Sequence, residues 1–300
     1  GGGSPIIRGF STNRLLIAVD GIRFNTAIFR GGNVQSVISI DPFTVDHTEV
    51  ILGPGSVVYG SDAIGGVMNF YTKKAKFSFK EGISFSGNTI ARYATASEEK
   101  TGHIDFNVGL KEWAFLTSVS YTDFGDLKMG KYGPDDYLRP EYAGTINGED
   151  VMVTNDDPRL QVPTAYDQIN AMQKIRYMPS NNWDFNLGLF YTTTSDYPRY
   201  DRLIRERNGQ LRSAVWDYTP QEWINGNLMI TNKGTSFYDK SILTLSYQNF
   251  KEGRKDRNFG DDVLYETKEK VGAYTSALDF IKKFGKSKLF YGLEYVYNKV

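Results

Sequence analysis

After about residue 76, apolar and polar side chains alternate along the chain with a period of two. In the segment 101–110, the even positions from Ile104 to Leu110 are apolar, and the odd positions from His103 to Gly109 are polar or glycine. Because successive side chains of a β-strand point to opposite faces, this pattern predicts strands with one apolar and one polar face. We predict nine such strands, at 79–93, 101–110, 113–124, 168–179, 182–194, 222–232, 236–250, 269–282 and 287–298.

The lengths of these strands and of their connections favour a membrane protein. Strands of soluble proteins are usually about five or six residues long, whereas a tilted strand needs about nine to eleven to cross a bilayer. After the first hairpin, short turns alternate with long loops, which is typical of a transmembrane β-barrel. A large soluble barrel or sandwich is the alternative, and it leaves this alternation unexplained. The short turns lie near 110–113, 179–182, 232–236 and 282–287, and the long loops near 125–167, 195–221 and 251–268.

Composition narrows the function classes. The chain has 20 Tyr and 19 Phe, and aromatic side chains near strand ends suit a membrane–water interface; examples are Trp113, Tyr121, Trp183 and Tyr191. The 35 basic and 35 acidic residues balance, which argues against a nucleic-acid-binding protein. With no cysteine and two histidines, the chain offers no disulfide, no thiol nucleophile and no all-histidine zinc site. The sequence contains no run of eighteen apolar residues, so it does not predict a transmembrane helix.

The region before residue 76 has a different, glycine-rich pattern. Residues 15–19 predict a short buried strand that ends in the turn Asp20–Gly21, and residues 49–52 predict a second strand closed by 53–55. Glycines at 60, 65 and 66 permit tight turns and close approach of the backbone. These features predict a small, compact domain that can fill the lumen of a barrel.

Three strings in this region resemble the plug domain of TonB-dependent outer-membrane receptors: SPIIRGF at 4–10, LLIAVDGIRFN at 15–25 and EVILGPGSVVYGSDAIGGVMNF at 49–70. The sequences of these strings resemble those of receptors from the Bacteroidetes group. The residues that carry the plug motif are Arg8, Gly9, Asp20, Gly21, Arg23, Glu49, Gly53, Pro54, Tyr59, Gly60, Gly65 and Gly66.

The resemblance implies a mixed fold, in which a small α+β plug domain is followed by part of an antiparallel transmembrane β-barrel of about 22 strands. Residues 1–76 would be the C-terminal part of the plug, and residues 77–300 the first nine or so strands of the barrel. We expect the chain to be truncated at both ends.

One departure from the family pattern concerns how the plug is held. Many members carry arginines at the positions of His47 and Leu52, and these arginines pair with glutamates of the barrel. This chain must therefore hold its plug by hydrogen bonds and packing, or by other charges such as Arg8 and Arg23.

The resemblance implies an active importer in the outer membrane of a Gram-negative bacterium, without enzymatic activity and without a cofactor. Its expected partners are TonB with the inner-membrane energising complex, acting through a segment before residue 1, and the lipid and lipopolysaccharide around it. The expected cargo is a ferric siderophore or haem, with cobalamin or an oligosaccharide as alternatives. A non-transporting adhesin barrel is the alternative from another class.

Two regions offer candidate cargo-binding residues. By resemblance, the plug loop at 25–43 faces outward and carries the donors Arg30, Asn33 and Gln35. The loop at 195–221 carries arginines among aromatic residues, an arrangement that can grip carboxylates or catecholates by bidentate contacts and stacking. Contact with the barrel wall, a solvated rim, or contact with lipopolysaccharide phosphates are the alternatives. The candidates in this loop are Arg199, Arg202, Arg205 and Trp216, with Arg207 and Arg212 nearby.

Metal chemistry has few candidates, and we predict no metal site. His103 lies on the polar face of its strand and could ligate haem iron, or simply form hydrogen bonds in the lumen. The acidic pairs 135–136, 149–150 and 156–157 could bind calcium, although their spacing does not match an EF-hand loop. No spacing resembles a catalytic triad or a paired-carboxylate site.

Overall fold

A computed structural model describes residues 5–10, 14–24, 37–53, 55, 59–78, 81–234 and 236–300. The N-terminal region is a four-stranded sheet in the order β2–β1–β4–β3, and we call the described residues from 5 to 76 the plug. Strand β1 is parallel to β4, and the other two pairs are antiparallel. Its strands are β1 (Leu15–Val19), β2 (Ile22–Arg23), β3 (Val45–Leu52) and β4 (Gly66–Thr72), with short 3₁₀ turns η2 (Val37–Ser39) and η3 (Ser61–Ala63).

The predicted strand at 15–19 and its turn are confirmed. Asp20 and Gly21 have φ angles of 53° and 81°, a left-handed conformation that glycine adopts freely and aspartate tolerates. The predicted strand at 49–52 is longer than expected, because β3 starts at Val45 and pairs along its length with β4. The pattern of alternation did not predict β4, which is covered on both sides by β1 and β3.

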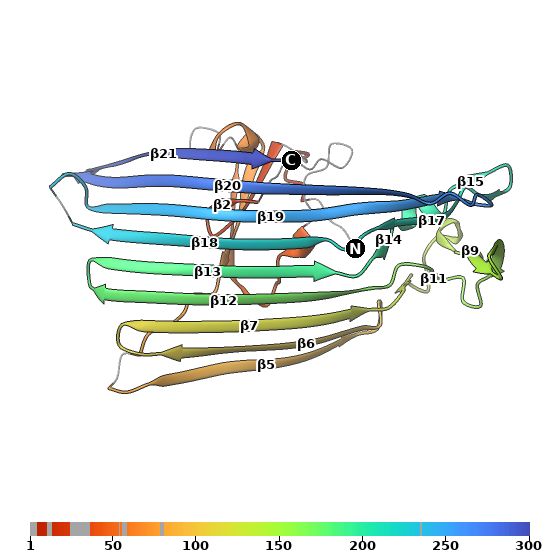
Figure 1. The fold of residues 1–300 in the computed structure, drawn as a ribbon, viewed down its shortest axis with the longest axis horizontal. Coiled ribbons are helices and arrows are strands. Elements are labelled where there is room, and N and C mark those ends of the chain that lie inside the picture. Colours follow the sequence, from red (N-terminus) through yellow and green to blue (C-terminus); the bar gives the residue numbers. More distant parts are fainter. Residues whose placement is uncertain are drawn as a thin grey trace.

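Nine long strands form one antiparallel sheet, in which each strand pairs with its neighbour in the chain (Figure 1). We call this sheet the wall. The nine predicted strands are confirmed, with shifted ends. They are β5 (Ser84–Ala94), β6 (Glu99–Gly109), β7 (Trp113–Phe124), β12 (Tyr166–Ser180), β13 (Trp183–Thr194), β18 (Glu222–Lys233), β19 (Lys240–Asn258), β20 (Tyr265–Phe284) and β21 (Ser287–Lys299).

Two predicted boundaries are wrong. The first strand begins at Ser84, not at residue 79. The long loop predicted at 251–268 is mostly strand, because β19 and β20 stay paired from Lys251 and Lys270 out to Asp256 and Tyr265. This extension is polar on both faces, so it lacks the alternation that reveals a strand whose one face is apolar.

The other two long loops contain structure of their own, at the right of Figure 1. Together with the β19–β20 extension they form what we call the outer lobe, residues 125–165, 195–221 and 251–268. A bidentate contact from Arg257 to Asp150, at 2.6 and 2.7 Å, ties two of its parts together. Its elements are β8 (Leu127–Lys128), η4 (Asp135–Tyr137), β9 (Glu141–Ile146), β10 (Glu149–Thr154), β11 (Leu160–Gln161), β14 (Tyr197–Pro198), α2 (Tyr200–Leu203), β15 (Glu206–Arg207), β16 (Gln210–Leu211) and β17 (Ser213–Tyr218).

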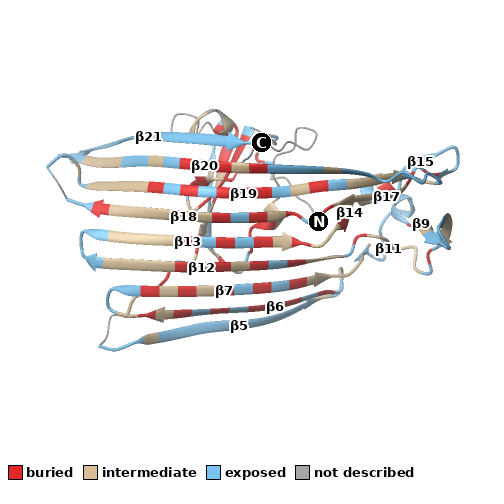
Figure 2. Ribbon diagram, viewed as in Figure 1, coloured by how far each residue is buried: buried red, intermediate tan, exposed pale blue. Residues whose placement is uncertain are grey.

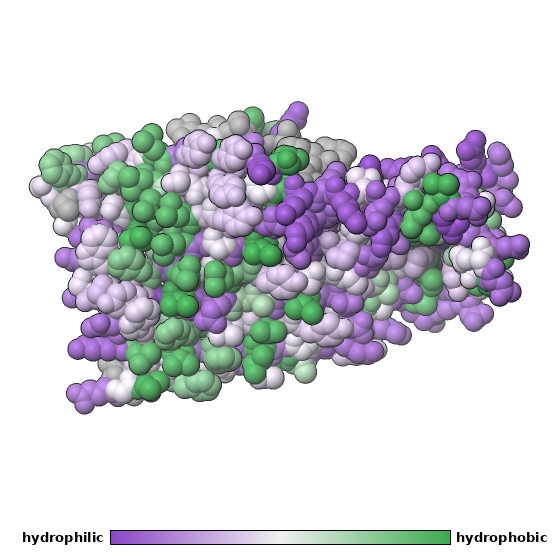
Figure 3. Space-filling view, viewed as in Figure 1, coloured by the Kyte–Doolittle hydropathy of each residue, from purple (hydrophilic) through white to green (hydrophobic). Residues whose placement is uncertain are grey.

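Burial on the wall is inverted relative to a soluble protein (Figure 2). On β6, His103 and Asp105 are 3% and 5% exposed, whereas Ile104 and Phe106 are 50% and 37% exposed. Figure 3 shows apolar side chains gathered over the middle of the long strands and hydrophilic ones over the outer lobe. The predicted faces are therefore confirmed: the apolar face points outward and the polar face points toward the plug, as lipid on one side and a polar interior on the other require.

Aromatic side chains mark the ends of the outward face. Trp113 and Trp183 are the first residues of β7 and β13, and Trp113 stacks on Tyr177 at a ring-centroid distance of 4.2 Å. Tyr121 and Tyr191 lie near the opposite ends of the same strands and are outward and exposed. This arrangement fits an interfacial girdle. Among the described residues, no helix is long and apolar enough to cross a membrane.

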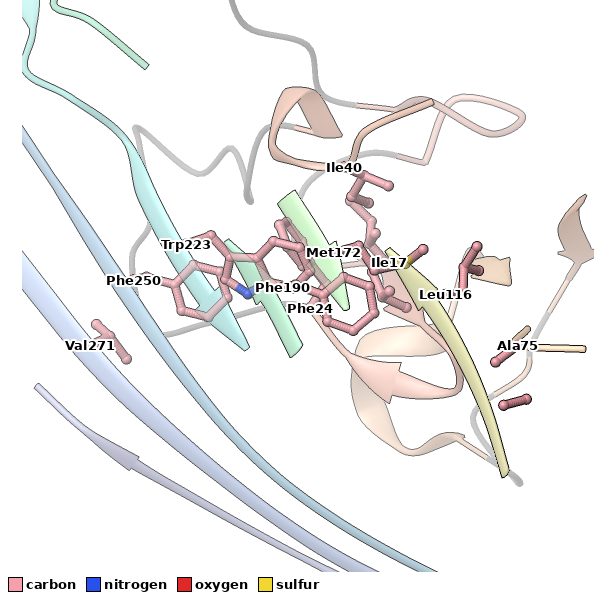
Figure 4. Packing of buried hydrophobic residues seen from close by; sticks show 12 residues of the cluster. Ile17, Phe24, Ile40, Ala75, Leu116, Met172, Phe190, Trp223, Phe250 and Val271 are labelled. Carbon is pink, nitrogen blue, oxygen red and sulfur yellow. The ribbon is translucent and has the colours of Figure 1, made fainter. Parts of the chain in front are cut away.

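The plug meets the wall through one apolar cluster (Figure 4). Phe24, which follows β2, lies edge-on to Trp223 and Phe250, with ring centroids 5.1 and 5.4 Å apart. Phe190 stacks on Trp223 at 5.7 Å. The otherwise polar inner face of the wall thus carries an aromatic patch where the β1–β2 hairpin packs against it.

Candidate functional site

A cavity of about 700 Å³ lies between the plug segment 37–48 and the ends of β5, β6, β7 and β12 nearest the outer lobe. Four aromatic side chains line it, namely Phe43, Phe70, Phe124 and Tyr166. Small-molecule sites in proteins are concave and largely apolar, with a few placed polar groups, and they commonly have this size. We call this space the plug cavity.

The ionisable groups that line the plug cavity make contacts with neighbouring residues. Arg92 approaches Glu99 at 3.4 Å, and His47 approaches Asp46 at 2.9 Å. Asp41 accepts hydrogen bonds from Ser120 and from the backbone of Phe43. The cavity therefore offers aromatic faces, amides such as those of Gln168 and Asn170, and an Arg92–Glu99 ion pair.

A buried ion pair joins the plug to the wall. Lys174 on β12 is 1% exposed, and its Nζ lies 2.6 Å from Oδ2 of Asp20. The same carboxylate accepts hydrogen bonds from the backbone N–H and the hydroxyl of Thr72, at 2.8 and 2.7 Å. The Lys174 ammonium also lies 4.8 Å from the ring centroid of Phe190. The carboxylate thus has three hydrogen-bond donors, and the ammonium has one carboxylate and one aromatic face, which compensates part of the cost of burying both charges.

Arg23 makes the second charge contact between plug and wall. Its guanidinium lies 3.1 Å from Glu294 on β21 and 3.5 Å from Asp62 of the plug, and it donates to the carbonyl of Tyr59. Arg23 thus contacts the wall, which supports the hypothesis that it helps to hold the plug. Arg8 is exposed in the turn at 7–10 and pairs with no carboxylate among the described residues.

His47 and Leu52, the two positions that depart from the family pattern, make other contacts or none with the wall among the described residues. His47 stacks on Tyr71 at 4.6 Å. Leu52 is half exposed at the end of β3. A third contact of plug and wall comes instead from Lys73, whose ammonium donates to Asp105 at 2.8 Å.

The remaining motif residues shape the plug itself. A Cβ on Gly65 would lie 2.4 Å from that of Phe10, and one on Gly66 would lie 2.7 Å from the carbonyl oxygen of Ile51, so only glycine fits. Glu49 accepts a hydrogen bond from Tyr71, and burial followed by the charge of Glu49 raises the pKa of Tyr71 and of Tyr59. Gly9, Gly53 and Gly60 have positive φ angles, and Pro54 lies outside the described residues.

The structure brings together the candidate arginines of the loop at 195–221. Asp201 lies 2.7 Å from Arg199, 3.8 Å from Arg202 and 3.9 Å from Arg205. Arg199 and Arg202 also lie over the ring of Trp216, at 5.0 and 5.9 Å. Three guanidinium groups thus share one carboxylate, and Nε of Arg202 is buried without a hydrogen-bond partner among the described residues. We call these five residues the arginine cluster.

The other candidates fare differently. Arg30, Asn33 and Gln35 lie outside the described residues. Both ring nitrogens of His103 are engaged, Nδ1 with Ser120 at 2.7 Å and Nε2 with Asp105 at 3.0 Å. This favours the hydrogen-bonded alternative over haem ligation.

One member of each of two acidic pairs in the outer lobe is also engaged. Asp150 is bound by Arg257 and Asp157 by Lys128, and these hydrogen bonds lower the pKa of each carboxyl group. The described residues contain no group of three His, Cys, Asp or Glu side chains arranged to hold a metal ion. The calcium hypothesis therefore gains no support from this geometry.

Comparisons with known proteins place this geometry in a family. The sequence model of the family described as TonB-dependent Receptor Plug Domain matches residues 1–67. The chain is 39% identical over 126 residues to the vitamin B12 transporter BtuB of Vibrio vulnificus (strain CMCP6), a match that covers 42% of this chain and 17% of that transporter.

Solved structures match over nearly the whole chain and show its fold. The copper transporter OprC matches 99% of this chain at a TM-score of 0.73 and 15% identity, and the FrpB iron transporter from Neisseria meningitidis (F3-3 variant) matches 99% at 0.73 and 18%. The chain spans 40% and 44% of these two structures, so it covers less than half of such relatives. Residues 1–67 therefore match the plug of TonB-dependent receptors, which are proteins of the Gram-negative outer membrane, and the chain as a whole shares the fold of the solved transporters OprC and FrpB.

Proposed function

We propose that the protein is an active importer, in which residues 1–76 belong to the plug and residues 77–300 form the first nine strands of the barrel. TonB and its inner-membrane complex supply the energy by acting on the plug. The ion pairs between plug and wall support this proposal. Asp20, Arg23 and Lys73 join the plug to the wall by ion pairs, which can break and re-form without unfolding the barrel.

We infer that the cargo is an anionic iron chelate, a ferric siderophore or haem. The observation that carries this inference is the arginine cluster, where Arg199, Arg202 and Arg205 share the single carboxylate of Asp201. The excess positive charge beside Trp216 suits a carboxylate or catecholate, because guanidinium binds such groups bidentately and stacks on aromatic faces. The outer lobe is the extracellular end of such a barrel, so incoming cargo would meet the cluster there.

Cobalamin is the second candidate cargo. The similarity to a vitamin B12 transporter favours it, and so do the aromatic and amide groups of the plug cavity. An oligosaccharide would also suit aromatic faces and amides. A non-transporting adhesin is the remaining alternative, and the first experiment below separates it from an importer.

Uptake should depend on energy. We expect cells that carry the intact receptor to accumulate a radiolabelled ferric siderophore, haem or cyanocobalamin, and to lose this accumulation when TonB is deleted or the proton gradient is collapsed. Surface binding without energy-dependent accumulation of any of these would support the adhesin and contradict import.

The arginine cluster should control affinity for an anionic chelate. We expect the double variant Arg199→Gln/Arg202→Gln to weaken binding of a ferric catecholate to the purified receptor at least tenfold, since hydrogen bonds to charged groups contribute about 1.5–3 kcal/mol each. The matched control is Arg207→Gln, the same change in the same loop at an exposed position, which should alter the Kd less than twofold. If both variants changed the Kd equally, the cluster would contribute only through general surface charge, and the proposed binding site would be wrong.

A further inference from the structure

A continuous series of hydrogen bonds crosses from the plug into the wall beside the plug cavity. Asp41 of the plug accepts from the Ser120 hydroxyl at 2.7 Å, and Ser120 Oγ lies 2.7 Å from Nδ1 of His103. Nε2 of His103 lies 3.0 Å from Oδ2 of Asp105, which also accepts from Lys73 at 2.8 Å. We call these five residues the His103 relay. Except for Lys73, each is buried.

The hydrogens in this relay can be counted. A serine hydroxyl carries one hydrogen, and an ionised carboxylate can only accept, so Ser120 gives its hydrogen to Asp41. Nδ1 of His103 must then donate to Ser120. At the other end, Asp105 accepts from Lys73 and from Asn88 and is ionised, so Nε2 of His103 must donate as well. An imidazole that donates from both nitrogens is an imidazolium.

The surroundings balance the charge that this count requires. The imidazolium lies between the carboxylates of Asp41 and Asp105, and Lys73 neutralises the second of them. Among the other ionisable groups that line the cavity, Arg92 pairs with Glu99, and Asp46 contacts His47. Paired charges with satisfied hydrogen bonds are the condition under which a buried ion is tolerated.

The relay holds the floor of the plug cavity. Asp41 and Phe43 both line the cavity, and the Phe43 ring stacks on the His103 ring at a centroid distance of 4.8 Å and an angle of 21°. His103 therefore reaches this plug segment twice, through Ser120 to Asp41 and directly by stacking on Phe43. A positive charge on His103 strengthens both contacts, since aromatic faces attract cations.

We propose that His103 is a positioning residue, which as an imidazolium fixes Asp41 and Phe43 against the wall and so sets the shape of the plug cavity. Its importance for cargo rests on the proposed import function, but the charge state and the attachment do not. The hydrogen bonds that link Ser120, His103 and Asp105 follow the same order as in a hydrolytic triad, yet Ser120 is buried and its hydrogen is given to Asp41. The relay therefore provides an attachment and not a nucleophile.

The charge state is tested by solid-state ¹⁵N NMR of the histidine-labelled, full-length receptor in lipid, with the His103 signals assigned by their loss in His103→Gln. We expect both ring nitrogens to carry hydrogen. In Asp41→Asn, the amide can donate to Ser120, which frees the Ser120 hydrogen for Nδ1, so Nδ1 should lose its own. A bare Nδ1 in the unmodified receptor would mean that Ser120 donates to His103, and the proposal would be overturned.

The attachment is tested without cargo. Thr44 is buried at the end of the held segment, and the chain contains no cysteine, so Thr44→Cys reports on movement of the floor. We expect maleimide to label this cysteine at least tenfold faster in His103→Gln than in the control Tyr121→Phe, which changes the outward neighbour of Ser120. Equal rates would overturn the attachment. If the receptor bound no cargo, the proposed function would be refuted. The ¹⁵N NMR signals and the labelling rates would still test the charge state and the attachment.

Discussion

Lys174→Met is expected to free the plug from the wall, at a cost of about 3–5 kcal/mol in the stability of the plugged state. The substitution keeps the length of the side chain and removes its charge. Asp20 would then keep its hydrogen bonds from Thr72 while its negative charge stays buried without a cation. The energetic loss comes mainly from that stranded charge and not from the pair itself, because the pair was desolvated to form.

The measurement is the passage of solutes or ions through a barrel from which the plug has been released. Cells carrying the intact receptor with Lys174→Met should become sensitive to an antibiotic too large to pass a plugged barrel, and the purified receptor should show open-channel conductance at lower urea. Lys251→Met is the matched control, since Lys251 pairs with Glu222 in a contact that is 47% and 23% exposed. Such exposed pairs contribute little to stability, because water and salt screen them, so Lys251→Met should leave plug retention unchanged.

A second variant separates a stranded charge from a simple packing defect. Asp20→Asn combined with Lys174→Met removes both charges, so we expect it to recover most of the lost retention. If the double variant leaks as much as Lys174→Met, the charge argument is wrong.

The strands of the wall could be predicted from the sequence, because each strand must alternate apolar residues that face lipid with polar residues that face inward. Outward Ile104 and inward Asp105 differ so strongly that a period of two is visible without any knowledge of neighbours. The β19–β20 extension was not predicted because neighbouring residues on opposite faces, such as Arg254 and Lys255, are both polar. Backbone pairing and ion pairs to distant residues, such as Lys255 to Asp196 and Arg257 to Asp150, hold it, and neither gives an alternating pattern in the sequence.

The contacts that hold the plug could be predicted only in part. Arg23 belongs to a recognisable motif, so its role was open to inference from the sequence. Its partner Glu294 lies 271 residues away, and Lys174 lies 154 residues from Asp20, so no local pattern joins them. One signal was present: Lys174 is a cation on the inner face of a predicted strand, where a long charged side chain needs a partner.

Phe24→Ala should have an effect as large as that of Lys174→Met, by a different route. Phe24 is 1% exposed and lies between Trp223 and Phe250, and truncating such a side chain costs about 3–5 kcal/mol. The barrel keeps its own hydrogen bonds, so its resistance to heat should not change while plug retention falls. Phe106→Ala, which removes an outward ring of the same kind, is the control and should leave retention unchanged.

The two large effects should not add. Asp20 is in the turn of the β1–β2 hairpin, Arg23 ends β2, and Phe24 follows it, so one short hairpin carries the ion pairs to Lys174 and Glu294 and the aromatic contact to Trp223. Contacts that share a rigid element are lost together, so Phe24→Ala with Lys174→Met should cost clearly less than the sum of the single variants. Additive costs, measured as urea midpoints of channel opening, would mean that the plug is held at independent points. Loss of additivity would make this hairpin the element that a pull on the plug has to release.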